Sequence, residues 1–324
     1  MQQVVKMMGV ALALALGVSP AKAANYEFTA GDVGGVWYTT AAGLSQMVQG
    51  THPDVVLKTV PGGGVTNPAK LQAGASQFGL VQSIFATAAV KGATPFDGKP
   101  NPKIRLVLQG LAKNYVHYVQ TKGDTRSLAD ALKQPKLRIA LPRAGSTDEY
   151  TFRFIMKHYG TSYDAIRANG GKVVNADYND IVSAFKDDQV DGFFVLLGIP
   201  GAAIIDAAQG RAAAVSPLPA ELVDHLASTY GYTKAAIPAT TYPDLQSRDA
   251  VTVVTSTSLY TSSDVADDVV FKVAAAICKD AAKLPDVHKS MMGFACNADA
   301  MGDGSVALHP GAKAYFAKAG IRQP

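Results

Sequence analysis

The feature that most constrains the fold of this chain is a repeated junction, in which a short β-like run passes through glycine or hydroxyl residues into a helix-like run. It occurs at residues 34–38, 62–67, 142–147 and 198–201. Strands and helices that alternate in this way form mostly parallel sheets covered by helices. Helix N-termini carry unpaired N–H donors and partial positive charge, so several of them at one place suit a small polar anion. No acid, base or nucleophile accompanies the junctions, which favours a protein that holds a solute over an enzyme.

The length of the chain predicts two α/β domains. Its 324 residues, 48% of them hydrophobic, are enough to bury two cores of ordinary size. A second series of strands and helices starts at 137–141, and the β-branched run 251–255 is expected to pair back into the first domain. We therefore expect one domain at 24–120 and 250–324 and the other at 121–249. Ligands of open α/β sheets bind beyond the carboxyl ends of the strands, which predicts a cleft between the two domains.

The N-terminus has the pattern of a signal peptide over residues 1–23. An apolar stretch at 7–18 follows Lys6, and Ala21-Lys22-Ala23 has the small-x-small form that a signal peptidase reads. Cleavage near Ala23 would place the protein in the periplasm. The alternative, a retained membrane anchor, is disfavoured because the apolar stretch is short and interrupted by glycine. Without this segment the formal net charge falls from +4 to +2, and such a mild balance argues against nucleic acid as a partner.

The two cysteines, Cys278 and Cys296, lie on either side of a helix-like segment near the C-terminus. In an exported chain such a pair is expected to form a disulfide. Two isolated cysteines and six histidines without ligand spacing give no metal site, and no cofactor motif is present.

Short motifs in order along nearly the whole mature chain resemble one family, the TAXI solute receptors of tripartite ATP-independent periplasmic (TRAP) transporters. The motifs are Gly34-Gly35-Val36-Trp37-Tyr38, Pro61-Gly62-Gly63-Gly64-Val65-Thr66-Asn67, Leu80-Val81-Gln82-Ser83, Ser127-Leu128-Ala129-Asp130, Val190-Asp191-Gly192-Phe193-Phe194, Gly198-Ile199-Pro200, Ile237-Pro238-Ala239-Thr240-Thr241-Tyr242-Pro243 and Leu308-His309-Pro310-Gly311-Ala312.

The resemblance implies an α/β, type II periplasmic-binding-protein fold, with two lobes of mostly parallel sheet and a ligand cleft between them. It also implies a monomer that captures a small carboxylate, such as an amino acid or an oxo-acid, and delivers it to the membrane permease subunits of a TRAP transporter. Carried over residue by residue, the candidate contacts are Gly35, Val36, Trp37, Tyr38, Gly63, Gly64, Asn67, Gln82, Ser83, Ser146, Thr147, Phe194, Gly198 and Tyr242.

The chain departs from the family pattern at two places in the expected pocket. It has Ala144-Gly145-Ser146-Thr147 where the family often has Gly-Ser-Gly-Thr, and Ile84 where an acidic residue often follows Gln-Ser. Arg143, just before the first of these, could grip a carboxylate with two hydrogen bonds or form a surface salt bridge. Both departures leave the solute of this protein open.

Several candidate residues also have a purely structural interpretation. Ser146 and Glu149 have the spacing of a capping box. Asn67 could cap the helix that it precedes, and Trp37 could pack in the core. The loop position of Tyr242 favours a ligand contact through its hydroxyl.

These patterns together predict a non-enzymatic solute-binding protein. The competing hypothesis is a periplasmic sensor subunit that presents the same solute to a signalling membrane protein.

Overall fold

The structure is a computed structural model that describes residues 24–31, 33 and 35–322. The predicted signal peptide and Gly34 lie outside these residues. The strands of the described residues are β1 (Ala24–Thr29), β2 (Val55–Val60), β3 (Phe78–Gln82), β4 (Ile104–Thr121), β5 (Arg138–Pro142), β6 (Lys172–Ala176), β7 (Gly192–Leu197), β8 (Ala213–Ser216), β9 (Thr233–Ile237) and β10 (Ala250–Ser262).

Helices separate most of these strands, as the junctions predict. The α-helices of the described residues are α1 (Val36–Thr51), α2 (Thr66–Ala73), α3 (Ser83–Lys91), α4 (Leu128–Lys133), α5 (Thr147–His158), α6 (Tyr163–Ala168), α7 (Tyr178–Lys186), α8 (Ala202–Gly210), α9 (Ala220–Tyr230), α10 (Asp267–Lys279), α11 (Leu284–Val287) and α12 (Pro310–Lys318). Short 3₁₀ turns include η3 (Lys289–Met291).

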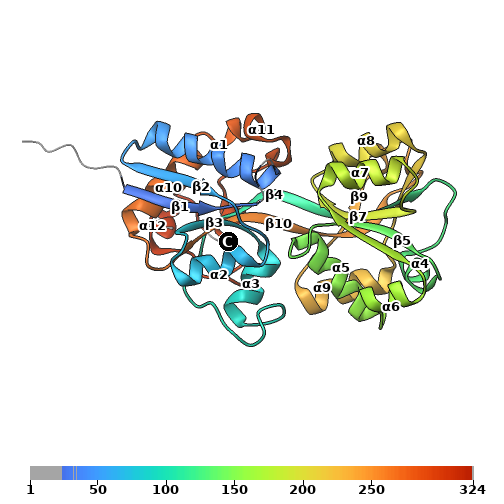
Figure 1. Ribbon diagram of the computed structural model, residues 1–324. Coiled ribbons are helices and arrows are strands. Elements are labelled where there is room, and N and C mark those ends of the chain that lie inside the picture. The colour runs from blue at the N-terminus through green and yellow to red at the C-terminus, as the bar shows by residue number, and fades with distance from the viewer. Residues whose placement is uncertain (1–23, 32, 34, 323–324) are drawn as a thin grey trace, which may run out of the picture.

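All ten of these strands join one sheet that runs through both lobes of the molecule (Figure 1). The strand order is β2-β1-β3-β10-β4-β7-β5-β6, with β8 on β4 and β9 on β10. In the first lobe β1 pairs in parallel with β2 and β3, and in the second lobe β5 pairs in parallel with β6 and β7. The pairs made by β4 and β10 are antiparallel. The expected α/β fold with two lobes is thus confirmed.

Two long strands connect the lobes. The first part of β10, up to Val254, pairs with β9 of the second lobe, and the part from Thr257 onward pairs with β3 of the first lobe. The strand β4 passes between the lobes in the opposite order: it begins in the first lobe, and its stretch 115–121 pairs with β7 and β8 of the second lobe. The sequence shows two apolar runs here, but they form one continuous strand. Gly110 makes this possible because its φ of +77° allows the irregularity in register opposite Ser258.

The lobes also meet away from these strands. Phe85 of α3 contacts Tyr150 and Phe154 of α5, with ring centroids 5.9 and 6.3 Å apart. All three residues belong to or pack against one apolar cluster that continues from the first lobe into the second. Such edge contacts between aromatic rings stabilise a pair beyond the burial of its surface. The two lobes are therefore closed against each other on the α3 and α5 side.

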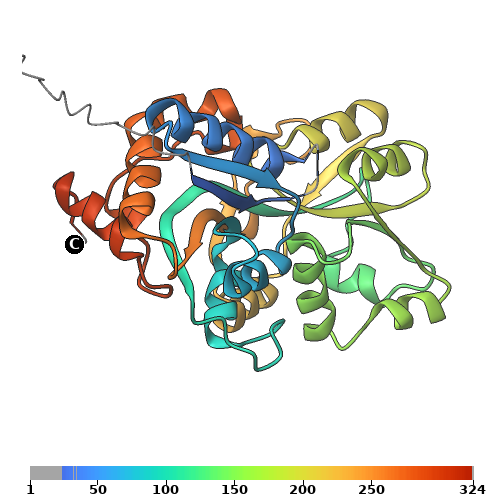
Figure 2. The ribbon, with the colours of Figure 1, turned by 60° about the vertical axis from the view of Figure 1, so that its left-hand side comes forward.

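The C-terminal region completes the first lobe. Helix α12 packs on α10, on the side of this lobe that faces away from the second one (Figure 2). Cys278 at the end of α10 forms the predicted disulfide with Cys296. None of the helices within the described residues combines the length and the apolar character needed to cross a bilayer.

Candidate functional site

The predicted junctions face each other across the boundary between the lobes. Gln82 at the end of β3 pairs with Thr257, and Leu197 at the end of β7 pairs with Tyr115, so both parallel strand sets end at the stretch where β4 and β10 pass between lobes. The carboxyl ends of parallel strands are the usual place for a ligand.

Two glycines mark the closest approach of the lobes. A Cβ atom at Gly64 would lie only 2.5 Å from Oγ1 and 3.1 Å from the backbone N of Thr147, the first residue of α5. A Cβ atom at Gly198 would lie 3.1 Å from the Cβ of Ser290 in η3 of the first lobe. The glycine loop 62–64 and the turn 198–201 are therefore inter-lobe contacts, as the sequence predicts for a closing cleft.

Four α-helices within the described residues begin with neither a side-chain cap nor an acidic residue in the first turn. They are α1, α2, α3 and α8. Three of them start at or beside a predicted junction, at Val36, Thr66 and Ala202, and the fourth starts at Ser83, the last residue of the Leu80-Val81-Gln82-Ser83 motif. In contrast, α4, α5, α6 and α7 are each capped by a serine or aspartate side chain. The first N–H groups of a helix lack partners within the helix, so uncapped starts are the ones that leave donors for a ligand.

Asn67 is a fully buried residue that connects the end of β1, the glycine loop after β2 and the middle of β3. Its Oδ1 accepts from the hydroxyl of Thr29 and from the N–H of Gly63, both at 2.9 Å. Its Nδ2 donates to the carbonyl oxygens of Ala30 and Leu80 at 2.7 and 2.8 Å. Asn67 lies in the first turn of α2 and does not cap it. Because both ends of its amide are occupied, it shapes the glycine loop, and the predicted ligand contact through this side chain finds no free group.

A second polar cluster centres on Thr257, a residue that sequence reasoning missed. The indole N–H of Trp37 and the Nε2 of Gln82 both donate to its hydroxyl oxygen, at 3.1 and 3.2 Å. The same hydroxyl donates to Oδ1 of Asn114 at 3.0 Å. Gln82 is 2% exposed, and its Oε1 has no hydrogen-bond partner among the described residues. The structure thus brings together two predicted site residues and two unpredicted ones.

The remaining first-lobe candidates lie beside this cluster. The hydroxyl of Ser83 donates to the carbonyl of Ser256 in β10 at 3.0 Å. In the first turn of α1, Val36 is exposed and Tyr38 is half-buried, and Gly35 is the residue before the helix. Gly63 donates to Asn67 as described above.

The start of α5 has the structural interpretation that the sequence allowed. The hydroxyl of Ser146 accepts from the N–H of Glu149 at 3.2 Å, and the buried carboxylate of Glu149 accepts from the N–H of Gly145 at 3.1 Å. The side chain of Arg143 is exposed and forms a salt bridge of 3.1 Å with Asp177. The structure therefore shows the surface salt bridge for Arg143 and the cap for Ser146, and it leaves Thr147 as the residue of this junction that meets the other lobe.

The carboxyl group of Asp148, the residue after Thr147 in α5, is buried. Its Oδ1 accepts from the backbone N–H of Leu196 at 2.6 Å and from the hydroxyl of Tyr178 at 2.9 Å. Burial raises the pKa of Asp148 to about 6, although these hydrogen bonds pull the pKa in the other direction. Below that pH the group is neutral and does not oppose an anion at the start of α5.

Two aromatic candidates lie in the core instead of at the cleft wall. Phe194 has no exposed surface and packs on Phe152 with ring centroids 5.3 Å apart. The hydroxyl of Tyr242 accepts from the N–H of Gly201 at 2.6 Å and also lies 3.2 Å from Nε2 of His117. Burial lowers the pKa of His117 to about 4, so its imidazole is neutral at pH 7. Tyr242 therefore supports the turn before α8, because its hydroxyl is already bonded. The sequence around a loop tyrosine does not show whether its side chain packs in the core or faces a ligand.

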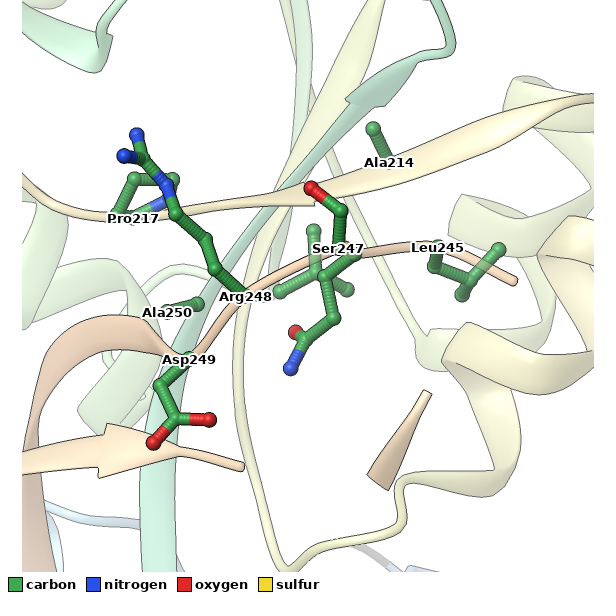
Figure 3. Close-up of a pocket in the computed structure, with 9 residues that line it drawn as sticks. Ala214, Pro217, Leu245, Ser247, Arg248, Asp249 and Ala250 are labelled. Carbon is green, nitrogen blue, oxygen red and sulfur yellow. The ribbon is translucent and has the colours of Figure 1, made fainter. Parts of the chain in front are cut away.

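A hollow of about 210 Å³ lies elsewhere in the second lobe. It is bordered by β8, the start of β10 and the loop before β10, and the side chains of Arg248 and Asp249 point away from each other (Figure 3). Ligand pockets for small molecules are usually larger, at about 300–1,000 Å³. We therefore assign the candidate site to the inter-lobe junctions. The described residues contain no group of three or more His, Cys, Asp or Glu arranged to hold a metal ion.

Comparison with solved structures supports the fold. The periplasmic binding protein BugD superposes with a TM-score of 0.52 at 14% sequence identity, over 94% of this chain and 100% of that one. MatC from Rhodopseudomonas palustris with bound malate gives a TM-score of 0.51 at 14% identity, over 91% of this chain and 96% of that one. The fold is therefore the two-lobe fold of periplasmic binding proteins. A family model matches residues 28–320, and the chain belongs to the NMT1-like family.

Proposed function

We propose that the protein is an exported receptor that holds a small organic anion between its lobes and delivers it to a membrane permease. The permease in this proposal is a TRAP transporter, and the receptor belongs to its TAXI group. The sequence motifs support this group, and the fold and the NMT1-like family are consistent with it. The receptor carries out no chemistry on the solute.

The observation that carries the proposal is the set of four uncapped α-helix starts beside the boundary between the lobes. The starts of α1, α2 and α3 follow first-lobe strands and the start of α8 follows β7 of the second lobe, so the two sets face each other across the boundary between the lobes. Their N–H groups and partial positive charges would stabilise an anion without a charged side chain. This fits a chain whose one candidate arginine, Arg143, is exposed and bonded to Asp177.

The close approach of Gly64 to Thr147 supports a receptor that closes on its solute. Periplasmic binding proteins close by a hinge motion, which buries the ligand between lobes. Here the hinge strands are β4 and β10, and the loop before α2 meets the start of α5 when the lobes are together. A solute held by α1, α2 and α3 would then be covered by the second lobe.

A thermal-shift screen tests the proposal. The panel contains malate and other dicarboxylates, pyruvate and other oxo-acids, amino acids and alkanesulfonates, each at millimolar concentration. A solute that binds only the folded state raises Tm, and we expect one carboxylate class to do so. The matched control is the neutral amide of each active acid, which should have no effect. An uncharged solute that binds while every anion fails would contradict the proposal.

Uptake measurements test the permease. In cells that lack this gene, accumulation of the radiolabelled solute should fall and return on complementation. Collapse of the ion gradient should abolish uptake in complemented cells. Uptake that persists without an ion gradient would contradict a TRAP partner, and normal uptake with a lost transcriptional response would favour the sensor hypothesis.

A further inference from the structure

The site and the hinge share one side chain, the hydroxyl of Thr257. In β10, Thr257 is the first residue that pairs with β3, and the preceding stretch 250–254 pairs with β9 of the other lobe. In β4, Asn114 directly precedes the stretch 115–120 that pairs with β7. The contact between Thr257 and Asn114 therefore connects the two strands at the point where each leaves one lobe for the other.

The hydroxyl of Thr257 is also fully used. It accepts from Trp37 at 3.1 Å and from Gln82 at 3.2 Å, and it donates its only proton to Asn114 at 3.0 Å. Thr257 is 2% exposed. A hydroxyl has one donor and two acceptor positions, so these three bonds occupy all of them.

The two donors come from the starts of α1 and α3. Trp37 is the second residue of α1, and Gln82 directly precedes α3. Both helices begin without a side-chain cap, so their positions and the direction of their first N–H groups depend on neighbouring contacts. Thr257 supplies one such contact to each.

The same bond orients the amide of Gln82. Its Nε2 is occupied by Thr257, which leaves Oε1 as the end without a partner among the described residues. A buried acceptor of this kind is costly unless a donor reaches it. Without the Thr257 hydroxyl, the amide would no longer have a preferred orientation.

We propose that Thr257 is a positioning residue, which holds Trp37 and Gln82 in the solute site and ties both to the hinge strands through Asn114. Movement of the hinge and geometry of the site then change together. This inference rests on the proposed function for its meaning, but the contact itself can be tested without a solute.

The test uses the single tryptophan. In protein labelled with ¹⁵N-tryptophan, Trp37 gives one indole N–H resonance, whose chemical shift and exchange with water report its hydrogen bond. Thr257→Val removes the hydroxyl and preserves the shape. We expect the resonance to shift and its exchange to accelerate at least about fivefold, as for loss of one hydrogen bond. Thr257→Ser should restore both values.

The matched control is Thr261→Val. Thr261 is a fully buried threonine of the same strand, and its hydroxyl donates to the carbonyl of Gln77 at 2.7 Å, away from Trp37. This variant should leave the indole resonance unchanged. Should Thr257→Val fail to fold, Asn114→Ala carries the test, because the half-buried Asn114 can be removed without a core cavity. It should also accelerate indole exchange.

Binding of malate, pyruvate and glutamate to the same variants separates the two proposals. If one of them binds wild type, Thr257→Val should weaken it at least tenfold and Thr257→Ser should restore it. Equal dissociation constants for wild type and Thr257→Val would overturn the inference and leave the proposed function intact. An unchanged indole resonance in Thr257→Val would overturn it whether or not any of the three binds.

Discussion

Gly64 shows how a single missing Cβ can set the distance between two lobes. A methyl group there would lie 2.5 Å from Oγ1 of Thr147, closer than a Cβ atom approaches a non-bonded neighbour, whereas at Gly63 the nearest atom would be Oγ1 of Thr66 at 3.4 Å. The loop tolerates one substitution and not the other. The backbone freedom of glycine is not the reason at Gly64; the reason is contact with the other lobe.

We therefore expect Gly64→Ala to keep the lobes apart and to weaken solute binding at least tenfold, with little change in the free energy of unfolding. Calorimetric titration gives the affinity, and small-angle scattering gives the radius of gyration, which should increase. Gly50→Ala is the control, because a Cβ atom there would meet nothing within 4 Å, and it should bind as wild type does. Full affinity in Gly64→Ala would show that the lobes do not need this contact to close.

Asp148 predicts an unusual pH dependence. Since its folded pKa of about 6 lies above the ordinary value of 3.8, the folded state favours the protonated acid. This contribution to stability is complete at low pH and is lost as pH rises toward and through about 6. The loss is up to about 3 kcal/mol.

Asp148→Asn should remove this loss, so the free energy of unfolding of the variant relative to wild type should rise between pH 4 and pH 7.5. Urea titrations at both pH values measure the difference. The comparison is necessary because His117, whose pKa is lowered to about 4, acts in the opposite sense over the same range. Parallel pH profiles for the two proteins would show that Asp148 is not buried as an acid.

At the scale of the elements, strand ends are joined by a side chain from a helix. Asn67 of α2 bonds to the end of β1, to the glycine loop after β2 and to β3. Its removal would take one hydrogen bond from each of four groups, and a buried group left without a partner costs about 1–3 kcal/mol.

Asn67→Ala should lower the free energy of unfolding by at least about 3 kcal/mol, as measured by urea denaturation. The control is Asn101→Ala, which removes a buried asparagine whose Nδ2 donates only to Ala89 and Lys99, at 3.3 and 3.1 Å. The free energy of unfolding should fall less in Asn101→Ala than in Asn67→Ala. Equal decreases in the free energy of unfolding for the two variants would mean that burial of an asparagine, and not the hydrogen bonds of Asn67 to β1, the glycine loop and β3, explains the decrease.

The sequence predicts the positions of helices and strands better than it predicts the contacts of individual side chains. Local signals such as the glycine before α2 and the serine before α5 place helix starts within a residue or two, because caps and turns depend on neighbours in sequence. Thr257 and Asn114 carry no such signal. A threonine in a β-branched run and an asparagine between two apolar runs fit any strand, and their role follows from a contact across 143 residues of chain.

The predicted positions of two aromatic residues, Phe194 and Tyr242, differ from the structure for a related reason. Phe194 and Tyr242 were expected at the cleft wall, yet one is in the core and the other is bonded to Gly201. Apolar rings serve a pocket and a core equally well, and only the packing of distant helices decides between them. The capping box at Ser146, which the sequence offers as the alternative to a ligand contact, is present in the structure, and it can be read locally because its two members are three residues apart.

At the scale of the whole molecule, the disulfide fixes a segment that reaches from one lobe to the other. Residues 279–295 lie between Cys278 and Cys296, and Ser290 within them contacts the Gly198 turn of the second lobe. A crosslink that closes a loop of this length stabilises a protein by about 3 kcal/mol, mainly by restricting the unfolded chain.

The double variant Cys278→Ser with Cys296→Ser should therefore have a lower Tm, and wild type should fall to the same Tm in the presence of a strong reductant. The reductant should have no effect on the double variant, which serves as the control. A wild-type Tm that does not respond to complete reduction would show that packing alone holds this segment.

The position of β10 in the sheet also determines the order in which the two lobes can fold. This strand lies between β3 and β4 in the sheet, although it begins only at Ala250. Until this strand is in place, β3 and β4 each have an open edge, and open strand edges pair readily with other chains. The second lobe is made from one continuous stretch of chain and can form first. The lobe that contains β1 cannot complete its sheet without β10, which lies in nearly the last quarter of the chain.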